Sequence, residues 1–268
     1  MKWMIRALCI FTLMNTMSIP VNASSVIRWG LYQSNPGEIP QGEATTEFLA
    51  EYDAYFHGFA EGKRSLFLTF DAGYEDGNTE KILDSLKEMG IPAAFFVTGS
   101  YIKHNPDIVK RIVDDGHLVC NHTMTHPDTT QLNSANFSTE LKKVEEEYKA
   151  IVGSEMPKYY RPPSGVFSQE NLRDAKAMGY KTVLWSIAYR DWHKEQPTHK
   201  EAFSKTIPKL HPGAIVLLHT TSTTNAAILA EWIEQCHELG YIFRNLDDLP
   251  QQEGQIHYSS SSLSPFSK

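Results

Sequence analysis

The sequence predicts an α/β fold built on parallel strands, either a barrel or a doubly wound sheet. Two observations lead to this prediction. Short apolar runs, typical of buried strands, alternate with helical patterns along most of the chain. Glycines also follow several of the helical runs directly before a strand, where glycine can take the left-handed conformation that ends a helix. Repeated strand–helix units of this kind favour parallel strands covered by helices.

The elements follow one another in regular order after residue 64. Strands are expected at six apolar runs: Leu66–Phe70, Ala93–Thr98, His117–Asn121, Thr182–Ile187, Ala214–Leu218 and Tyr241–Arg244. Helical periodicity predicts helices at Thr79–Met89, Pro106–Asp115, Ser138–Val152, Gln169–Met178, Glu201–Leu210 and Ala226–Leu239. The glycines that end helices before a strand are Gly90, Gly116, Gly179 and Gly240. Ahead of this regular part, Thr45–Phe56 has a helix-like pattern.

No low-complexity linker divides the middle of the chain, so residues 64–250 are expected to form one domain. The 268 residues are ample for a sizeable core. Residues 24–63 are expected to form an N-terminal extension that packs on this domain. Residues 251–268 have the Ser-rich composition of a disordered tail.

Residues 1–23 are typical of an export signal. Lys2 and Arg6 form a positive start, Ala7–Ile19 is a short apolar region, and Val21–Ala23 offers small residues for cleavage. The apolar region is shorter than the ~20 residues that span a bilayer. We therefore expect export across the cytoplasmic membrane of a bacterium, with an uncleaved anchor as the alternative.

Charge and cysteine content exclude several classes of protein. The formal net charge of −7 provides no basic field for nucleic acid or anionic lipid, so no nucleic-acid partner is expected. Three cysteines are too few for a disulfide scaffold, and Cys9 lies within the export signal. Cys120 and Cys236 are expected to be buried, unreactive thiols rather than a bridge or a nucleophile.

Polar side chains stand after four of the predicted strands and after the apolar pair Tyr159-Tyr160. They are Asp71, the pair His122 and His126, Arg161, Asp191, and His219. Each residue alone is weak evidence for a functional site. An aspartate after a strand is more often a helix cap, and two histidines four residues apart can either bind a metal or make ordinary hydrogen bonds. The carboxyl ends of parallel strands share one rim, so all of them are expected to line one cleft.

The segments around these residues resemble the five motifs of carbohydrate esterase family 4, the polysaccharide deacetylases with a NodB homology domain. The segments are Thr69–Gly73, Asn121–His126, Arg161–Gly165, Asp191–Trp192 and Leu217–His219, in the family's order. The resemblance covers residues 63–247. It implies a distorted (β/α) barrel with about seven parallel strands and an enzyme that hydrolyses an acetamide.

The resemblance also implies roles for individual residues. The catalytic set is Asp71 as general base, His219 as general acid, Arg161 as the partner of the base, and Asp191 as the partner of the acid. His122 and His126 correspond to two metal ligands. Contacts with the sugar are expected from Trp192, Tyr74, Pro163 and Arg190. Amide hydrolysis suits such a set, because an ionised carboxylate can accept a proton from water and imidazole can protonate the leaving amine.

Two positions depart from the family pattern. Ala72 replaces the aspartate that is the usual third metal ligand, and Ala188 stands where the fourth motif begins with another aspartate. The expected cofactor is therefore a weakly bound divalent metal, zinc. Glu75, Asp76 or water completes its shell, or the enzyme works with little or no metal.

The same departures, together with Ile27–Leu31, resemble one branch of the family, the sporulation deacetylases that act on N-acetylmuramic acid. The expected substrate is peptidoglycan freed of its stem peptide, on the way to muramic δ-lactam in the cell wall or spore cortex. Glycan strands are the only expected partner, and the protein is expected to be a monomer. Two alternatives stay open: a deacetylase of N-acetylglucosamine in wall glycan, chitin oligomers or acetylated xylan, and a non-catalytic glycan-binding module.

Overall fold

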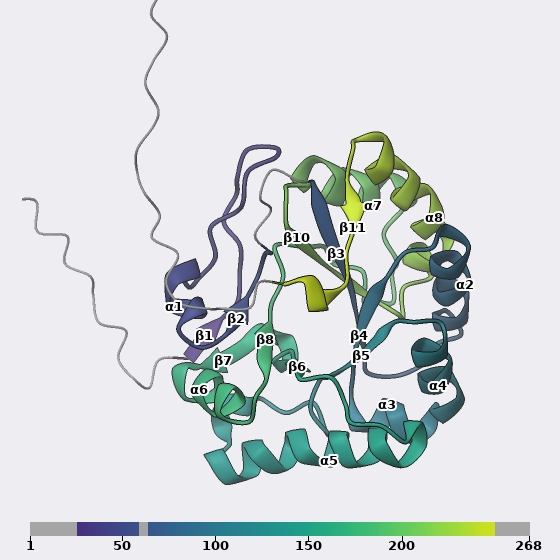
Figure 1. Cartoon of the computed structure of the whole chain (residues 1–268). Helices are drawn as coiled ribbons and strands as arrows, with labels where there is room; N and C mark the ends of the chain where they lie inside the picture. The colour runs from purple at the N-terminus through teal and green to yellow at the C-terminus, as the bar shows by residue number, and fades with distance from the viewer. Residues whose placement is uncertain (1–25, 59–63, 250–268) are drawn as a thin grey trace, which may run out of the picture.

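The computed structural model describes residues 26–58 and 64–249, which form a curled sheet with helices around its outside (Figure 1). The strands are β1 (Val26–Arg28), β2 (Ala54–Tyr55), β3 (Ser65–Ala72), β4 (Ala93–Val97), β5 (Leu118–Asn121), β6 (Tyr159–Tyr160), β7 (Val166–Ser168), β8 (Lys181–Val183), β9 (Ile187–Ala188), β10 (Ala214–His219) and β11 (Ile242–Phe243). The helices are α1 (Thr46–Ala50), α2 (Thr79–Met89), α3 (Gly99–His104), α4 (Pro106–Asp114), α5 (Ser134–Val152), α6 (Gln169–Ala177), α7 (His199–Thr206) and α8 (Thr223–Glu238).

The main sheet has the strand order β2-β8-β6-β5-β4-β3-β10-β9, with β11 beside β3. Every strand pairing within it is parallel. The sheet curls into a half-barrel, and the prediction of a parallel α/β barrel-like fold is confirmed.

The segment between β8 and β9 joins the two edges of this sheet. The Leu184 amide donates to the Tyr55 carbonyl (2.7 Å) beside β2, and two residues later the Ser186 amide donates to the Ile215 carbonyl (3.0 Å) in β10. One extended segment therefore changes partners from one side of the sheet to the other. This explains why the predicted strand Thr182–Ile187 is divided into β8 and β9.

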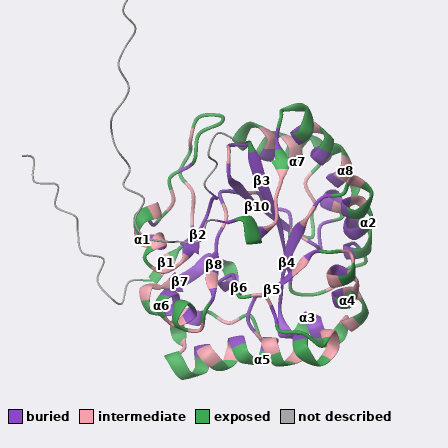
Figure 2. Cartoon of the chain, viewed as in Figure 1, coloured by how far each residue is buried: buried purple, intermediate pink, exposed green. Residues whose placement is uncertain are grey.

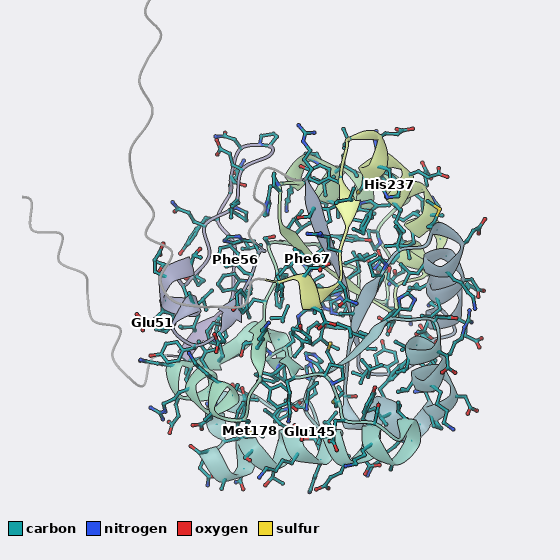
Figure 3. All side chains as sticks on the ribbon, viewed as in Figure 1. Glu51, Phe56, Phe67, Glu145, Met178 and His237 are labelled. Atoms are coloured by element: carbon teal, nitrogen blue, oxygen red, sulfur yellow. The ribbon has the colours of Figure 1, made fainter. Side chains whose placement is uncertain are left out.

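Strand β3 separates two layers of the core. Its alternate residues Leu66, Leu68, Phe70 and Ala72 pack against the helices, whereas Phe67 packs in the barrel interior with residues of the other strands (Figure 3). Figure 2 shows buried residues along the strands and on the inner faces of the helices. Two leucines, Leu246 and Leu249, also pack in the barrel interior. Since side chains of a strand alternate between its faces, Thr69 and Asp71 belong to the interior side with Phe67.

The N-terminal segment packs against the barrel. Strand β1 pairs antiparallel with β7. The Trp29 amide donates to the Gly165 carbonyl (2.8 Å), and the Trp29 indole donates to the Trp185 carbonyl (2.9 Å). These bonds tie the segment to the Arg161–Gly165 loop and to the chain after β8.

Local structure also differs from the expectation at Thr45–Phe56 and at Gly99–His104. The stretch Thr45–Phe56 is helical only over α1, because Asp53 adopts a positive φ of 51° and β2 follows it. Helix α3 was not predicted, since six residues are too few to show periodicity. Its N-cap is Thr98, whose hydroxyl accepts from the Tyr101 amide (3.1 Å).

The predicted thiols are buried and unpaired, and burial raises the pKa of Cys236 to about 12. The predicted export signal and the Ser-rich tail lie outside the described residues. Among the residues that the structure describes, no helix is long and apolar enough to cross a membrane.

A close backbone contact makes one glycine necessary. Gly213 has φ 78°, and an added Cβ would collide with the backbone of Gly58, whose amide donates to the Gly213 carbonyl (2.7 Å). Gly116 has a similar φ of 85°, but the space around its Cα is open. We expect Gly116→Ala to cost about 1 kcal/mol of unfolding free energy from the left-handed backbone alone. Gly213→Ala should cost about 2–4 kcal/mol, because overpacking adds to the same strain.

Urea unfolding of both variants measures the difference. Equal losses for Gly116→Ala and Gly213→Ala would show that the contact with Gly58 imposes no constraint.

Candidate active site

The polar residues at the strand ends line or border one cavity of about 650 Å³. Asp71 and His219 are register partners at the ends of the adjacent strands β3 and β10. The cavity is lined by Asp71, Gly73, Tyr74, Thr98, Ser100, His122, Met124, Thr125, His126, Ser164, Trp185, Trp192, Leu217, His219 and Thr221. Arg161 and Asp191 lie behind this wall, where they contact Asp71 and His219. The structure thus brings all six predicted polar residues together.

Arg161 is a fully buried cation that holds Asp71 in place. Its Nη1 donates to Asp71 Oδ1 (2.8 Å), and its Nε donates to the Val183 carbonyl (2.9 Å). Its Nη2 donates to Thr69 Oγ1 (2.9 Å), and the ring of Phe96 lies 4.0 Å from the guanidinium carbon. These contacts fix the guanidinium from several strands.

Thr69 is a supporting residue that the sequence analysis did not single out. Its hydroxyl accepts from Arg161 and donates to the Val216 carbonyl (2.7 Å). The available signal was its position two residues before Asp71, which places both side chains on one face of β3.

The charge on Asp71 is stabilised by its neighbours. Burial alone would raise its pKa, but the positive charge of Arg161 holds the pKa below its ordinary value. Asp71 is therefore ionised at neutral pH, and an ionised carboxylate can accept a proton.

Asp191 and His219 form a second pair beside the first. His219 Nδ1 donates to Asp191 Oδ1 (2.7 Å), and the His219 amide donates to Asp191 Oδ2 (2.9 Å). Burial lowers the pKa of His219, but the hydrogen bond and the charge of Asp191 more than offset this and raise the pKa above its ordinary value. Since Nδ1 is engaged, Nε2 is the ring nitrogen left to exchange protons with a molecule in the cavity.

His122 and His126 lie together at the cavity wall. Their ring centroids are 4.9 Å apart. His122 Nδ1 donates to the Arg161 carbonyl (2.9 Å), which leaves its Nε2 as an acceptor 3.6 Å from Asp71 Oδ2. Burial lowers the pKa of His122 to about 4, so this imidazole is neutral at pH 7. A neutral imidazole with a free nitrogen is the form that binds a metal.

A third protein ligand for a metal is missing from the described residues. Ala72 faces the helix layer, on the opposite side of β3 from Asp71. Glu75 turns to the start of α2, where its Oε1 accepts from the Thr79 amide (3.3 Å) and its Oε2 accepts from the Tyr101 hydroxyl (2.8 Å). Asp76 does not line the cavity. Within residues 26–58 and 64–249, no cluster of three or more potential ligands could hold a metal ion. The site therefore fits two ligands of a zinc centre and lacks the third.

The residues expected to contact the sugar have different positions. Tyr74 and Trp192 line the cavity with exposed rings, and the ring of Trp192 lies 5.1 Å from that of His219. Pro163 is buried, and its neighbour Ser164 reaches the cavity instead. Arg190 is exposed outside the cavity lining, and its Nε donates to His193 Nε2 (3.1 Å). The structure does not bring Pro163 or Arg190 to the cavity wall.

Comparisons with known proteins agree with this geometry. Residues 59–183 match the polysaccharide deacetylase family. The peptidoglycan-N-acetylmuramic acid deacetylase PdaA of Bacillus subtilis is 40% identical over 253 residues, which cover 93% of this chain and 96% of that protein. A solved structure of Bacillus subtilis PdaA, described as a family 4 carbohydrate esterase, has a TM-score of 0.80 and covers 84% of this chain and 97% of that one. A peptidoglycan-N-acetylglucosamine deacetylase of Bacillus cereus is 32% identical, over 68% of this chain and 65% of that protein.

The Asp191–His219 pair predicts a specific titration. Asp191→Asn removes the negative charge that stabilises the imidazolium, so we expect the pKa of His219 to fall by about one unit or more. Nuclear magnetic resonance of histidine-labelled protein measures this value directly. His104 on α3 lies apart from the pair and provides an internal reference in the same spectra. An unchanged pKa at His219 would contradict the assigned electrostatic role of Asp191.

Proposed function

The chain belongs to the polysaccharide deacetylases of carbohydrate esterase family 4, and from this membership we propose that it removes the acetyl group from N-acetylmuramic acid in peptidoglycan. As a member of this family it is a hydrolase that acts on an amide bond. We propose further that its substrate has lost its stem peptide and that the reaction is a step towards muramic δ-lactam in spore cortex. The observation that carries the chemistry is the side-by-side placement of Asp71 and His219 at one cavity.

In the first step Asp71 is the general base. Its carboxylate takes a proton from a water molecule, and the water oxygen attacks the carbonyl carbon of the acetamide. The hydrogen bond from Arg161 Nη1 to Asp71 Oδ1 keeps Asp71 ionised and holds its carboxylate in position. The product of this step is a tetrahedral intermediate that carries a negative charge on the former carbonyl oxygen.

In the second step His219 is the general acid. The bond between carbon and nitrogen breaks as His219 Nε2 gives its proton to the leaving nitrogen, which yields a free amine and acetic acid, and the acid then ionises to acetate in solvent. Asp191 holds the ring through Nδ1 and favours the protonated form that the step requires. Asp71 then returns its proton to solvent, and His219 takes one up.

The proposal of muramic acid as the target sugar is supported by the extent of sequence similarity to the two deacetylases. The muramic acid deacetylase matches nearly the whole chain at 40% identity, whereas the glucosamine deacetylase matches about two thirds of it at 32%. N-acetylglucosamine is therefore the second candidate. In either case Tyr74 and Trp192 offer flat apolar faces to a sugar ring. Arg190 is proposed to meet substrate groups that extend outside the cavity, the lactyl carboxylate among them.

The proposed substrate also implies a location and a partner. Peptidoglycan lies outside the cytoplasmic membrane, so the proposal includes export through the signal at residues 1–23 and work in the cell wall or spore cortex space. Glycan strands are the proposed partner of a monomeric enzyme.

Two experiments test the function. Mass spectrometry of peptide-stripped glycan strands after incubation should show loss of acetyl from muramic acid. Loss from glucosamine alone would support the second candidate, and loss from neither would refute both. In the same assay, Asp71→Asn and His219→Ala should each lower kcat by about 100- to 10,000-fold, because each removes one proton-transfer group.

Circular dichroism serves as the control for both variants, which should retain the folded state. Turnover close to that of the unmodified protein in either variant would disprove the role assigned to that residue.

His122 and His126 are the two candidate ligands for a metal in this cavity. We propose that His122 and His126 bind zinc weakly, since a catalytic zinc site usually has three protein ligands. Bound zinc would supply a Lewis acid at the acetamide oxygen. Titration calorimetry should give a dissociation constant of about 1 μM or weaker, and His126→Ala should abolish binding. His104→Ala is the matched control. Nanomolar binding would show that a third protein group joins the site.

A further inference from the structure

Asp191 is a fully buried carboxylate whose surroundings change during the proposed reaction. While His219 is protonated, the two charges compensate each other. Once His219 has given up its Nε2 proton, the imidazole is neutral and Asp191 loses its counter-charge. The nearby cation Arg161 is already paired with Asp71. A buried anion without a partner is costly unless hydrogen bonds stabilise it.

Asn225 provides such a hydrogen bond. Its Nδ2 donates to Asp191 Oδ2 (2.6 Å) and to the His219 carbonyl (3.3 Å). A carboxylate only accepts hydrogen bonds, so the amide nitrogen of Asn225 must face it. The other end of the amide is fixed as well, because the Tyr189 hydroxyl donates to Asn225 Oδ1. Asn225 is therefore held in one orientation, with its donor end on the carboxylate.

The start of α8 places Asn225 at this position. Ser222 is the N-cap of the helix, and its hydroxyl accepts from the Asn225 amide (3.1 Å) and donates to Gln196 Oε1 (2.7 Å). Side chains of a helix tilt toward its N-terminus, so Asn225 points back to the end of β10. The positive end of the helix dipole at the same place also favours an anion.

We propose that Asn225 is a positioning residue of this deacetylase, which keeps Asp191 anionic and in place after His219 has passed its proton to the leaving amine. The proposal rests on the function proposed above. In this step the Nε2–H bond of His219 breaks and an N–H bond forms on the amine. Nδ1 keeps its hydrogen and its bond to Asp191, and Asn225 transfers no proton.

The proposal predicts that loss of the Asn225 donor raises the pKa of His219. The charged groups that face His219 are Asp191 from the segment after β9, Asp71 from β3 and Arg161 from the segment after β6. Loss of the Asn225 donor leaves all of them in place but destabilises the deprotonated pair more than the protonated one. His219 should then hold its proton more tightly and become a weaker acid. This is the opposite of the change expected for Asp191→Asn.

Asn225→Leu tests the proposal, because leucine has a similar size and no donor. We expect kcat to fall about three- to tenfold, with KM changed less than about twofold because Asn225 does not line the cavity. The pKa of His219, measured by NMR titration, should rise by about half a unit to one unit.

Asn171→Leu is the matched control. Asn171 is also buried and holds the same helical position in α6, three residues after its N-cap Ser168. This variant should lose thermal stability and leave the His219 titration unchanged.

An unchanged or lowered pKa of His219 in Asn225→Leu would overturn the proposal, since a residue with a merely structural role gives one of these results. If Asn225→Leu does not fold, Tyr189→Phe decides, because it removes the hydroxyl that polarises the amide. A smaller rise in the same direction supports the proposal, and no rise overturns it. The titration needs no substrate, so a failure of the proposed function on every glycan would be recognised separately.

Discussion

The site depends on the ion pair between Arg161 and Asp71. A fully buried guanidinium must have partners for its charge and its donors, and here β3 and the segment around β8 provide them. The strands can supply those partners only when they are assembled in the parallel order observed. The same bonds that satisfy Arg161 hold the carboxylate at the cavity in its ionised state. Fold and chemistry therefore share one set of contacts.

Asp71 and His219, the proposed base and acid, have separate partners, and this separation shifts their pKa values in opposite directions. Asp71 faces a permanent cation and loses its proton readily, whereas His219 faces a buried anion and retains its proton. Both residues stand at neighbouring strand ends in one register. The proposed base and acid can thus be in their required protonation states at the same pH, and both already line one cavity.

Much of this arrangement was predictable from the sequence, and the limits have physical reasons. Asp71 and His219 could be placed at one rim because each follows an apolar strand, and parallel strands end at the same edge. Glu75 was a candidate ligand by proximity in the chain, but the free amides at the start of α2 bind it instead. Asn225 belongs to no motif, and its contact with Asp191 spans 34 positions of the chain. Such contacts depend on tertiary packing, which local patterns do not encode.

The packing of Leu246 and Leu249 inside the barrel has a consequence for how the protein is made. These residues are among the last of the described chain, yet they fill space beside Phe67, whose strand is formed by the early part of the domain. While the chain up to this point is still emerging from the ribosome, Phe67 lacks the cover of these two leucines. This contact in the barrel interior can form only after residue 249 has been synthesised. An apolar interior exposed in this way is prone to aggregate until then, so the protein should depend on chaperones until the segment with Leu246 and Leu249 has docked.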